Sequence, residues 1–310
     1  MTIRGSGIGI AIGPVRSCCR EVAKAMKIQR VGVVGAGTMG SGIAEVCARA
    51  GLDTIVVDID EASIGRAAEK IQNSIERAKN KGVLTVSQAD DALGHLRFKT
   101  TLEALSDRDL VIEAVIESEE EKIEVFQRLD KICPPEAILA SNTSSIPIVT
   151  LARATGRPDK VAGLHFFNPA PVQPLVEIIN GLTTSSETTD LLEPFCRDVL
   201  QKHVIRCRDR AGFVVNMLLV PFLLSAVRMV ESGFASPDDV DKGMKFGCAH
   251  PMGPLELCDL IGLDTIKAVA DVLYGEFNEP LYAPPPMLKR MVSAGLLGRK
   301  SGRGFFTYDR

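Results

Sequence analysis

The sequence predicts an α/β protein with a doubly wound, mainly parallel sheet followed by a second, all-helical domain. Up to about residue 210, short apolar runs rich in β-branched residues alternate with helical patterns, as in a parallel sheet covered by helices. Beyond that point strand signals vanish and the strong patterns are helical. We therefore expect a sheet domain over residues 28–210 and a helical domain over residues 211–310.

Each strand or helix is predicted from the spacing of its apolar residues and from the residues that typically begin or end a helix. Strands are predicted where β-branched residues cluster, at 31–34, 54–58, 110–115, 137–140, 160–167 and 174–179. Helices are predicted at 43–50, 61–81 and 119–132, and in the second half at 213–231, 237–246, 255–274 and 284–294. At Pro237, for example, Ser236 is a good cap, and aspartates follow the proline in the first turn.

Charge and cysteine content exclude several classes of protein. With 36 basic and 39 acidic residues, the chain lacks the basic surface that nucleic-acid binding requires, so no nucleic-acid partner is expected. The eight cysteines form no C-x-x-C pair, which argues against a zinc ribbon or a redox dithiol, and no metal is expected. Scattered reduced thiols fit a cytoplasmic protein.

Residues 1–27 carry no fold signal and are predicted to be an N-terminal extension. They are basic, with Glu21 as their one acidic residue, so a presequence over residues 1–25 and a location in the mitochondrial matrix are the alternative. The Gly and Ile run lacks a clear amphipathic helical period. This absence favours an extension over a presequence.

The longest uncharged stretch, residues 211–227, lies between Arg210 and Arg228. Its length is at the short end for a bilayer span, and Asn216 and Pro221 interrupt it. A buried helix at a subunit interface is therefore favoured over a membrane crossing. We expect a homodimer and no membrane partner.

The sequence Gly35-Ala36-Gly37-Thr38-Met39-Gly40 falls where a predicted strand turns into a helix. In this G-x-G-x-x-G context the first glycine allows a tight turn, the second lets the backbone approach a pyrophosphate, and the third lets helix and strand pack closely. Asp58 ends the next strand, where a carboxylate accepts hydrogen bonds from ribose hydroxyls and repels a 2′-phosphate. The pattern predicts a Rossmann-like domain that binds NAD, against the alternative of an ordinary glycine turn.

His165 is the candidate proton acceptor among the four histidines. It shares a strand face with Val161, Gly163 and Phe167, and Glu177 lies on the next predicted strand. One turn joins the strands, so the two side chains could meet, and a paired glutamate would hold the imidazole in one tautomer as a general base. A structural histidine beside a structural glutamate remains the alternative. The other histidines are expected to be surface or structural: His95, His203 and His250.

The hydroxyl-rich run Ser141-Asn142-Thr143-Ser144-Ser145 follows the strand predicted at 137–140. It therefore lies at a carboxyl end of the sheet, where open α/β folds bind ligands. Hydroxyls without a base are weak nucleophiles but good hydrogen-bond donors. We expect this run to bind substrate or nicotinamide rather than to act covalently, although a simple turn is also possible.

Five motifs carry a resemblance to known proteins: the glycine run 35–40, the hydroxyl run 141–145, His165-Phe166-Phe167-Asn168-Pro169, Gly212-Phe213-Val214-Val215-Asn216 and His250-Pro251-Met252-Gly253-Pro254. Taken together, they resemble the L-3-hydroxyacyl-CoA dehydrogenase family, and most closely its bacterial 3-hydroxybutyryl-CoA dehydrogenases. The likeness covers roughly residues 28–310 and includes the closing run 298–305. It implies reversible, NAD-dependent oxidation of a short-chain (S)-3-hydroxyacyl-CoA, with 3-hydroxybutanoyl-CoA as the expected substrate.

The resemblance also implies roles for single residues. It makes His165 the base and Glu177 its orienting partner, while Ser144 and Asn216 hold the reacting oxygen and nearby groups. Coenzyme A would contact Ser144, Arg77 and Lys81, although Arg77, Lys79 and Lys81 could also form a solvated helix face. The residues implied at the NAD site are Gly35, Gly37, Thr38, Met39, Gly40, Asp58, Glu113, Asn168 and Lys300.

The chain departs from the family pattern at three positions, with Pro174 and Arg77 where lysine is common and Ala211 where proline is common. These departures leave acyl-chain preference open. Two other functions are considered: a sugar-acid dehydrogenase of the same fold, resembling L-gulonate dehydrogenase, and a non-catalytic NAD-binding structural protein. The motif 165–168 argues against the first, and the intact His165 and Glu177 argue against the second.

Overall fold

The computed structural model describes residues 28–308. The predicted N-terminal extension, residues 1–27, lies outside the described residues. The chain forms two compact units, one that ends at Arg206 and one that begins at Cys207. The short segment Thr143–Pro147 interrupts the first unit and groups with the second.

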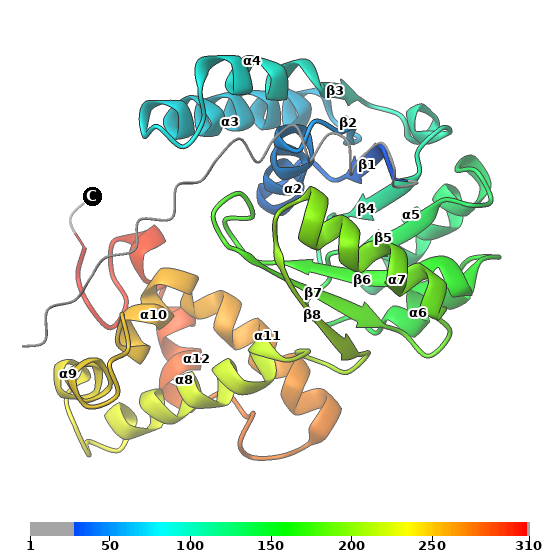
Figure 1. Ribbon diagram of the computed structural model, residues 1–310. Coiled ribbons are helices and arrows are strands. Elements are labelled where there is room, and N and C mark those ends of the chain that lie inside the picture. The colour runs from blue at the N-terminus through cyan, green and yellow to red at the C-terminus, as the bar shows by residue number, and fades with distance from the viewer. Residues whose placement is uncertain (1–27, 309–310) are drawn as a thin grey trace, which may run out of the picture. The chain divides into compact units, whose positions relative to one another are not determined.

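The first unit is built on an eight-stranded sheet with the order β3-β2-β1-β4-β5-β6-β7-β8 (Figure 1). From β3 to β6 the neighbouring strands are parallel, and β7 pairs antiparallel to β6, which confirms the mainly parallel doubly wound fold. The strand order reverses between β1 and β4, which marks the switch point where such sheets bind ligands. The strands are β1 (Arg30–Val34), β2 (Asp53–Val57), β3 (Leu96–Lys99), β4 (Leu110–Glu113), β5 (Ile138–Ser141), β6 (Val161–Phe166), β7 (Leu175–Asn180) and β8 (His203–Arg208).

Helices lie on both faces of this sheet (Figure 1), and the central strands are accordingly apolar and buried on both sides. Local signals start the helices: the Asp60 carboxylate accepts hydrogen bonds from the N–H groups of Ala62 and Ser63 at the start of α3. The helices of this unit are α2 (Thr38–Arg49), α3 (Glu61–Asn80), α4 (Val86–Gly94), α5 (Glu119–Ile132), α6 (Ile148–Arg153) and α7 (Ser186–Pro194), followed by the π-helical turn η3 (Phe195–Val199).

The sequence did not predict the two edge strands. Strand β3 has the sequence LRFK and alternates half-buried with exposed residues, and β8 has the sequence HVIRCR and two exposed arginines. Charged residues on edge strands prevent association with other sheets, but they remove the apolar run that identifies a strand. Tertiary pairing, rather than local composition, decides these two elements.

The second unit is helical around its own core of Leu223, Leu224, Leu255, Leu263 and Leu273. The helix predicted over 255–274 is wrong as one element, because Gly262 adopts φ +104° and separates two helices there. Only glycine reaches this conformation without strain. The helices are α8 (Val215–Glu231), α9 (Pro237–Gly247), α10 (Pro254–Ile261), α11 (Leu263–Phe277) and α12 (Pro286–Ser293).

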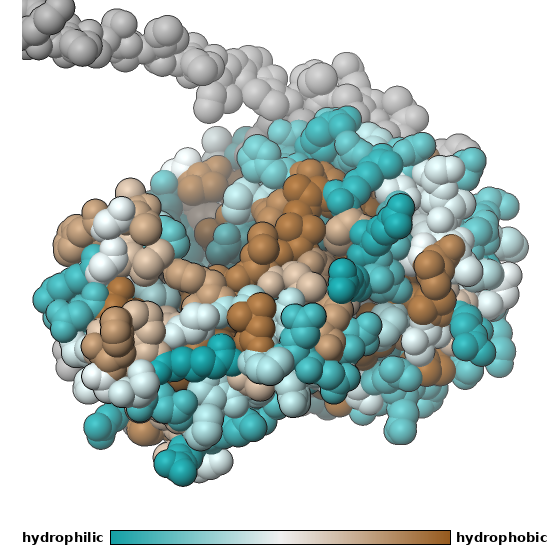
Figure 2. Space-filling view, turned by 90° about the horizontal axis from the view of Figure 1, so that it is seen from below, coloured by the Kyte–Doolittle hydropathy of each residue, from teal (hydrophilic) through white to brown (hydrophobic). Residues whose placement is uncertain are grey.

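Several large apolar side chains remain exposed in the second unit, among them Leu218, Phe234 and Phe246. Figure 2 shows apolar side chains gathered in patches between hydrophilic ones on the face seen there. Within residues 28–308, every helix is too short or too polar to cross a membrane.

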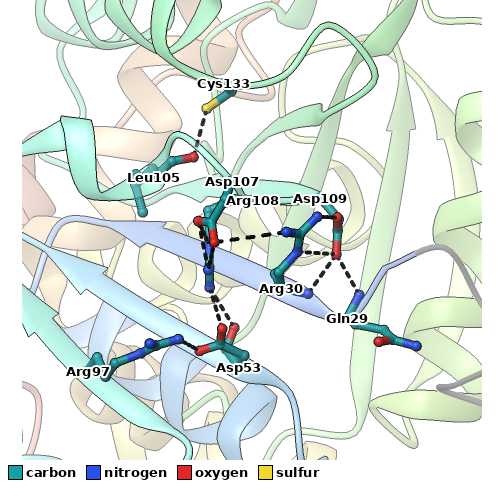
Figure 3. A network of polar contacts seen from close by, with 9 residues as sticks. All are labelled: Gln29, Arg30, Asp53, Arg97, Leu105, Asp107, Arg108, Asp109 and Cys133. Atoms are coloured by element: carbon teal, nitrogen blue, oxygen red, sulfur yellow. Dashed lines mark hydrogen bonds and ion pairs between the residues drawn. The ribbon is translucent and has the colours of Figure 1, made fainter.

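A network of charges occupies the amino ends of the central strands (Figure 3). Arg108 is 2% exposed and pairs with Asp53 and Asp107, while the Arg30 guanidinium donates to Asp109 at 2.7 Å. Arg97 also pairs with Asp53. Because these residues lie where β1, β2 and β4 begin, they stabilise the edge of the sheet opposite to the ligand-binding carboxyl edge.

Candidate active site

The turn between β1 and α2 contains the glycine motif. Gly35 adopts φ +100°, and its N–H donates to Val57 O at 2.8 Å, which joins the turn to the end of β2. A Cβ on Gly40 would lie 1.8 Å from Gly35 O, so only glycine allows helix and turn to approach this closely. A Cβ on Gly37 would meet nothing within 4 Å, which leaves open space over the N-terminus of α2 for a pyrophosphate.

Asp58 follows β2 and is held against the same turn. One oxygen of its carboxylate accepts a hydrogen bond from Ala36 N at 2.7 Å. Thr38 and Met39 form the first turn of α2, and Lys70 of α3 donates to Thr38 Oγ1 at 3.1 Å. The positive end of the α2 helix dipole, the open space beside Gly37 and the Asp58 carboxylate together form a cofactor cradle. This cradle fits the phosphates and the adenine ribose of NAD.

His165 and Glu177 face each other as a register pair of the antiparallel strands β6 and β7. Nδ1 of the imidazole lies 2.6 Å from Oε2 of the carboxylate, so the expected approach of the two side chains is confirmed. Glu177 is fully buried and His165 is 6% exposed, with the Phe167 ring 4.6 Å from the imidazole. A proton on Nδ1 would be donated to this carboxylate, which would hold the imidazole in one tautomer.

The resemblance implied that Glu113 lies near the cofactor, and the structure shows which groups its carboxylate contacts within the protein. Its carboxylate is fully buried and bonds to Lys122 Nζ at 2.6 Å, Ser141 Oγ at 2.6 Å and Val115 N at 2.7 Å. Glu113 thereby holds together the carboxyl ends of β4 and β5.

Lys122 at this edge was missed as a site residue by the sequence reasoning. Lys122 is 1% exposed. It directly follows three glutamates at the start of α5, and a charged sequence of this kind predicts a solvent-exposed helix face. Asn142 accepts a hydrogen bond from Phe166 N at 2.8 Å and so ties the end of β5 to the end of β6. Asn142 belongs to the run 141–145, which the sequence singled out because it directly follows a strand.

Ser144, Asn216 and Lys300 belong to the second unit, so the geometry of the first unit assigns them no role. Ser144 is half-buried, Asn216 lies in the first turn of α8, and Lys300 Nζ donates to Asp264 at 2.6 Å. Burial raises the pKa of the Asp264 carboxyl, but the hydrogen bond and charge of Lys300 outweigh this and lower it overall.

The cations proposed for coenzyme A lie on α3. Arg77 and Lys81 are exposed at its C-terminal end, and Arg77 lines a surface hollow together with Arg66 and Lys70. Glu69 and Asn73 complete this lining. Three cations against one carboxylate suit a phosphate-bearing ligand.

His203 and His250 are exposed, and the half-buried His95 follows α4.

Comparison with known proteins identifies the chain over nearly all its described length. Residues 30–210 match the model of the 3-hydroxyacyl-CoA dehydrogenase NAD binding domain, and residues 212–308 match that of the C-terminal domain. The chain belongs to the 3-hydroxyacyl-CoA dehydrogenase family. It is therefore an NAD-dependent oxidoreductase.

Relatives and solved structures agree on this family. A 3-hydroxybutyryl-CoA dehydrogenase of Mycobacterium tuberculosis is 58% identical over 91% of this chain and 99% of its own length. The crystal structure of FadB2 from M. tuberculosis, also 58% identical, covers 91% of this chain and 99% of its own with a TM-score of 0.90. That of (S)-3-hydroxybutyryl-CoA dehydrogenase from Ralstonia eutropha is 44% identical, covers 92% of this chain and 100% of its own, and has a TM-score of 0.87.

Proposed function

We propose that this protein catalyses the reversible, NAD-dependent oxidation of (S)-3-hydroxybutanoyl-CoA to the 3-oxoacyl-CoA, with His165 as the general base. The bond between His165 and Glu177 at the carboxyl edge of the sheet carries the proposal. The relatives of 58% and 44% identity, whose names specify 3-hydroxybutyryl-CoA, support the substrate.

The chemistry follows from the protonation of the imidazole. Bound NAD supplies the acceptor for the hydride that leaves C3. Nε2 of His165 takes the hydroxyl proton, which requires the hydroxyl to lie within about 3 Å of the ring. The Glu177 carboxylate keeps the other proton on Nδ1 and stabilises the imidazolium that forms. In the reverse direction the same imidazolium returns the proton to the oxygen.

Further residues are proposed to complete the site. Ser144 and Asn216 hold the reacting oxygen and nearby groups, and Asn168 and Lys300 contact the cofactor, as the family resemblance implies. Arg77 and Lys81 bind the phosphates of coenzyme A, which their exposure on α3 supports. A homodimer is proposed because large apolar side chains remain exposed in the second unit. A monomeric mass by light scattering would refute the dimer.

Oxidation of reduced NAD with acetoacetyl-CoA tests the activity. The wild-type protein should consume reduced NAD with this substrate and leave a free keto acid unreduced, whereas a sugar-acid dehydrogenase would do the reverse. His165→Gln should lose activity while binding reduced NAD normally, and the exposed His203→Gln serves as the matched control. Full activity of His165→Gln would exclude this residue as the base.

A further inference from the structure

Lys202 is a buried cation that the proposed reaction does not use. It is 7% exposed and lies directly before β8, with its backbone N–H bonded to Cys196 O at 2.9 Å. Its ammonium donates to the carbonyl oxygens of Ala170 and Gln173, each at 2.7 Å. Both acceptors belong to the loop 167–174 that connects β6, which carries His165, to β7, which carries Glu177.

The surroundings of the ammonium make this arrangement costly. Among the described residues, the charged or titratable groups that face it are Arg49 and Cys47 of α2 and Cys196 of η3. Burial raises the pKa of the Cys47 thiol to about 12, so that thiol is neutral, and burial raises that of Cys196 as well. Burial and the charge of Arg49 lower the pKa of Lys202. Because none of these neighbours is a carboxylate, the two loop carbonyls are the groups that compensate the charge.

The loop is held from a second side by the helix of the glycine motif. A Cβ on Gly42 of α2 would lie 3.2 Å from Ala170 Cβ and 3.3 Å from Pro171 Cδ, so helix and loop are in close contact. His203 N also donates to Pro174 O at 2.7 Å, where the loop enters β7. The loop therefore contacts both α2 and Lys202; Asn168 lies in this loop, and His165 lies in β6 two residues before the loop begins.

We propose that Lys202 is a positioning residue for the reaction: its ammonium fixes the loop 167–174 and thereby keeps the His165–Glu177 pair and Asn168 aligned with the bound nucleotide. This inference rests on the proposed function. A displacement of about 1 Å at a reacting group can lower a rate by roughly 100-fold, so a loosened loop should affect turnover more than binding of the acyl-CoA tail.

The test replaces Lys202 with Met, which has a similar length and no donors, in the full chain. We expect kcat with acetoacetyl-CoA to fall about tenfold or more, the KM for acetoacetyl-CoA to stay within about twofold, and the pH profile of kcat/KM to shift as the histidine pair is disturbed. Lys202→Arg, which restores a cation and donors, should recover part of kcat. Lys202→Gln keeps one donor group and is the milder variant to measure if Lys202→Met does not fold.

Arg157 provides a matched control. It is another buried cation of the first unit, 9% exposed, and it donates to the carbonyl oxygens of Asp130 at 2.7 Å and Cys133 at 3.2 Å. It precedes β6, at the amino end of that strand. Arg157→Met should lower thermal stability but leave kcat per folded molecule and the pH profile unchanged.

The outcomes separate this inference from the proposed function. If folded Lys202→Met or Lys202→Gln keeps the wild-type kcat and pH profile at any thermal stability, Lys202 is only structural and the inference is overturned. If His165→Gln remains active, the proposed base fails whatever Lys202 does. If His165→Gln is inactive and Lys202→Met is fully active, the proposed base stands and only the positioning role of Lys202 is rejected.

Discussion

The carboxylate of Glu177 is the residue on which the proposed base depends, because it lies 2.6 Å from Nδ1 of His165 and is fully buried. Glu177→Gln keeps the shape and removes the charge that stabilises the imidazolium. We expect kcat with acetoacetyl-CoA to fall at least about 100-fold, within the range general acid–base groups contribute. Fluorescence of bound reduced NAD should show unchanged affinity. Wild-type kcat in this variant would show that the glutamate serves only the fold.

Asp58 is expected to decide between the two nicotinamide dinucleotides. Its carboxylate is held by Ala36 N at the end of β2, where it repels the 2′-phosphate of NADP. Asp58→Ser should reduce the preference for NAD by about tenfold, equivalent to roughly 1.4 kcal/mol. The measurement is kcat/KM for NAD and NADP with one substrate, and an unchanged ratio would place the discrimination elsewhere.

At the scale of elements, α3 is expected to bind the nucleotide end of the substrate. Arg77→Ser and Lys81→Ser should each raise the KM for acetoacetyl-CoA several-fold, about 1 kcal/mol for an exposed charge contact with phosphate, and leave kcat unchanged. Lys79→Ser is the control, since Lys79 pairs with Glu76 at 2.6 Å. With acetoacetyl-pantetheine, which lacks the nucleotide, the effect should vanish. An equal loss on both substrates would contradict the assignment.

The sequence predicted six strands and most of the longer helices, but it missed the two edge strands and the shorter helices α4, α6 and α7. The glycine turn, the caps and the apolar runs of the six predicted strands are local features, and these strands lie within one or two residues of their predicted positions. The edge strands β3 and β8 were missed because their charged sequences resemble loops. The break at Gly262 was missed because an isolated glycine inside an apolar helical pattern does not reveal its φ.

At the scale of the whole molecule, the charge network at the amino ends of the strands should set acid stability. Burial raises the pKa of Asp53, but the hydrogen bond from Arg97 and the charge of Arg108 outweigh this and lower it overall. Burial also raises the pKa of Asp109, but hydrogen bonds from the Arg30 side chain and from the backbone N–H groups of Gln29 and Arg30 outweigh this and lower it overall. A carboxyl whose pKa is lowered on folding stabilises the folded state at pH values above its pKa in the unfolded chain, which is about 3.9. This stabilisation is lost as the pH falls through the lower pKa of the folded state.

Asp53→Asn should therefore flatten the acid side of the stability profile. The free energy of unfolding, measured in urea between about pH 6 and about pH 2, should fall less steeply in the variant than in the wild type. Asp238→Asn, which removes an exposed pair with Lys242, is the control and should leave the slope unchanged. If the free energy of unfolding falls equally steeply with pH in all three proteins, the charge network does not contribute to acid unfolding.

The sequence by itself determined the fold class, the use of NAD and the candidates His165 and Glu177, because spacing along one strand or through one turn encodes each of them. Tertiary structure alone decided that Glu113 is enclosed with Lys122 and Ser141, and that Lys202 bonds to the loop beside His165. Those contacts join segments distant in sequence. The burial that makes a charged group seek a particular partner arises only when the segments pack together.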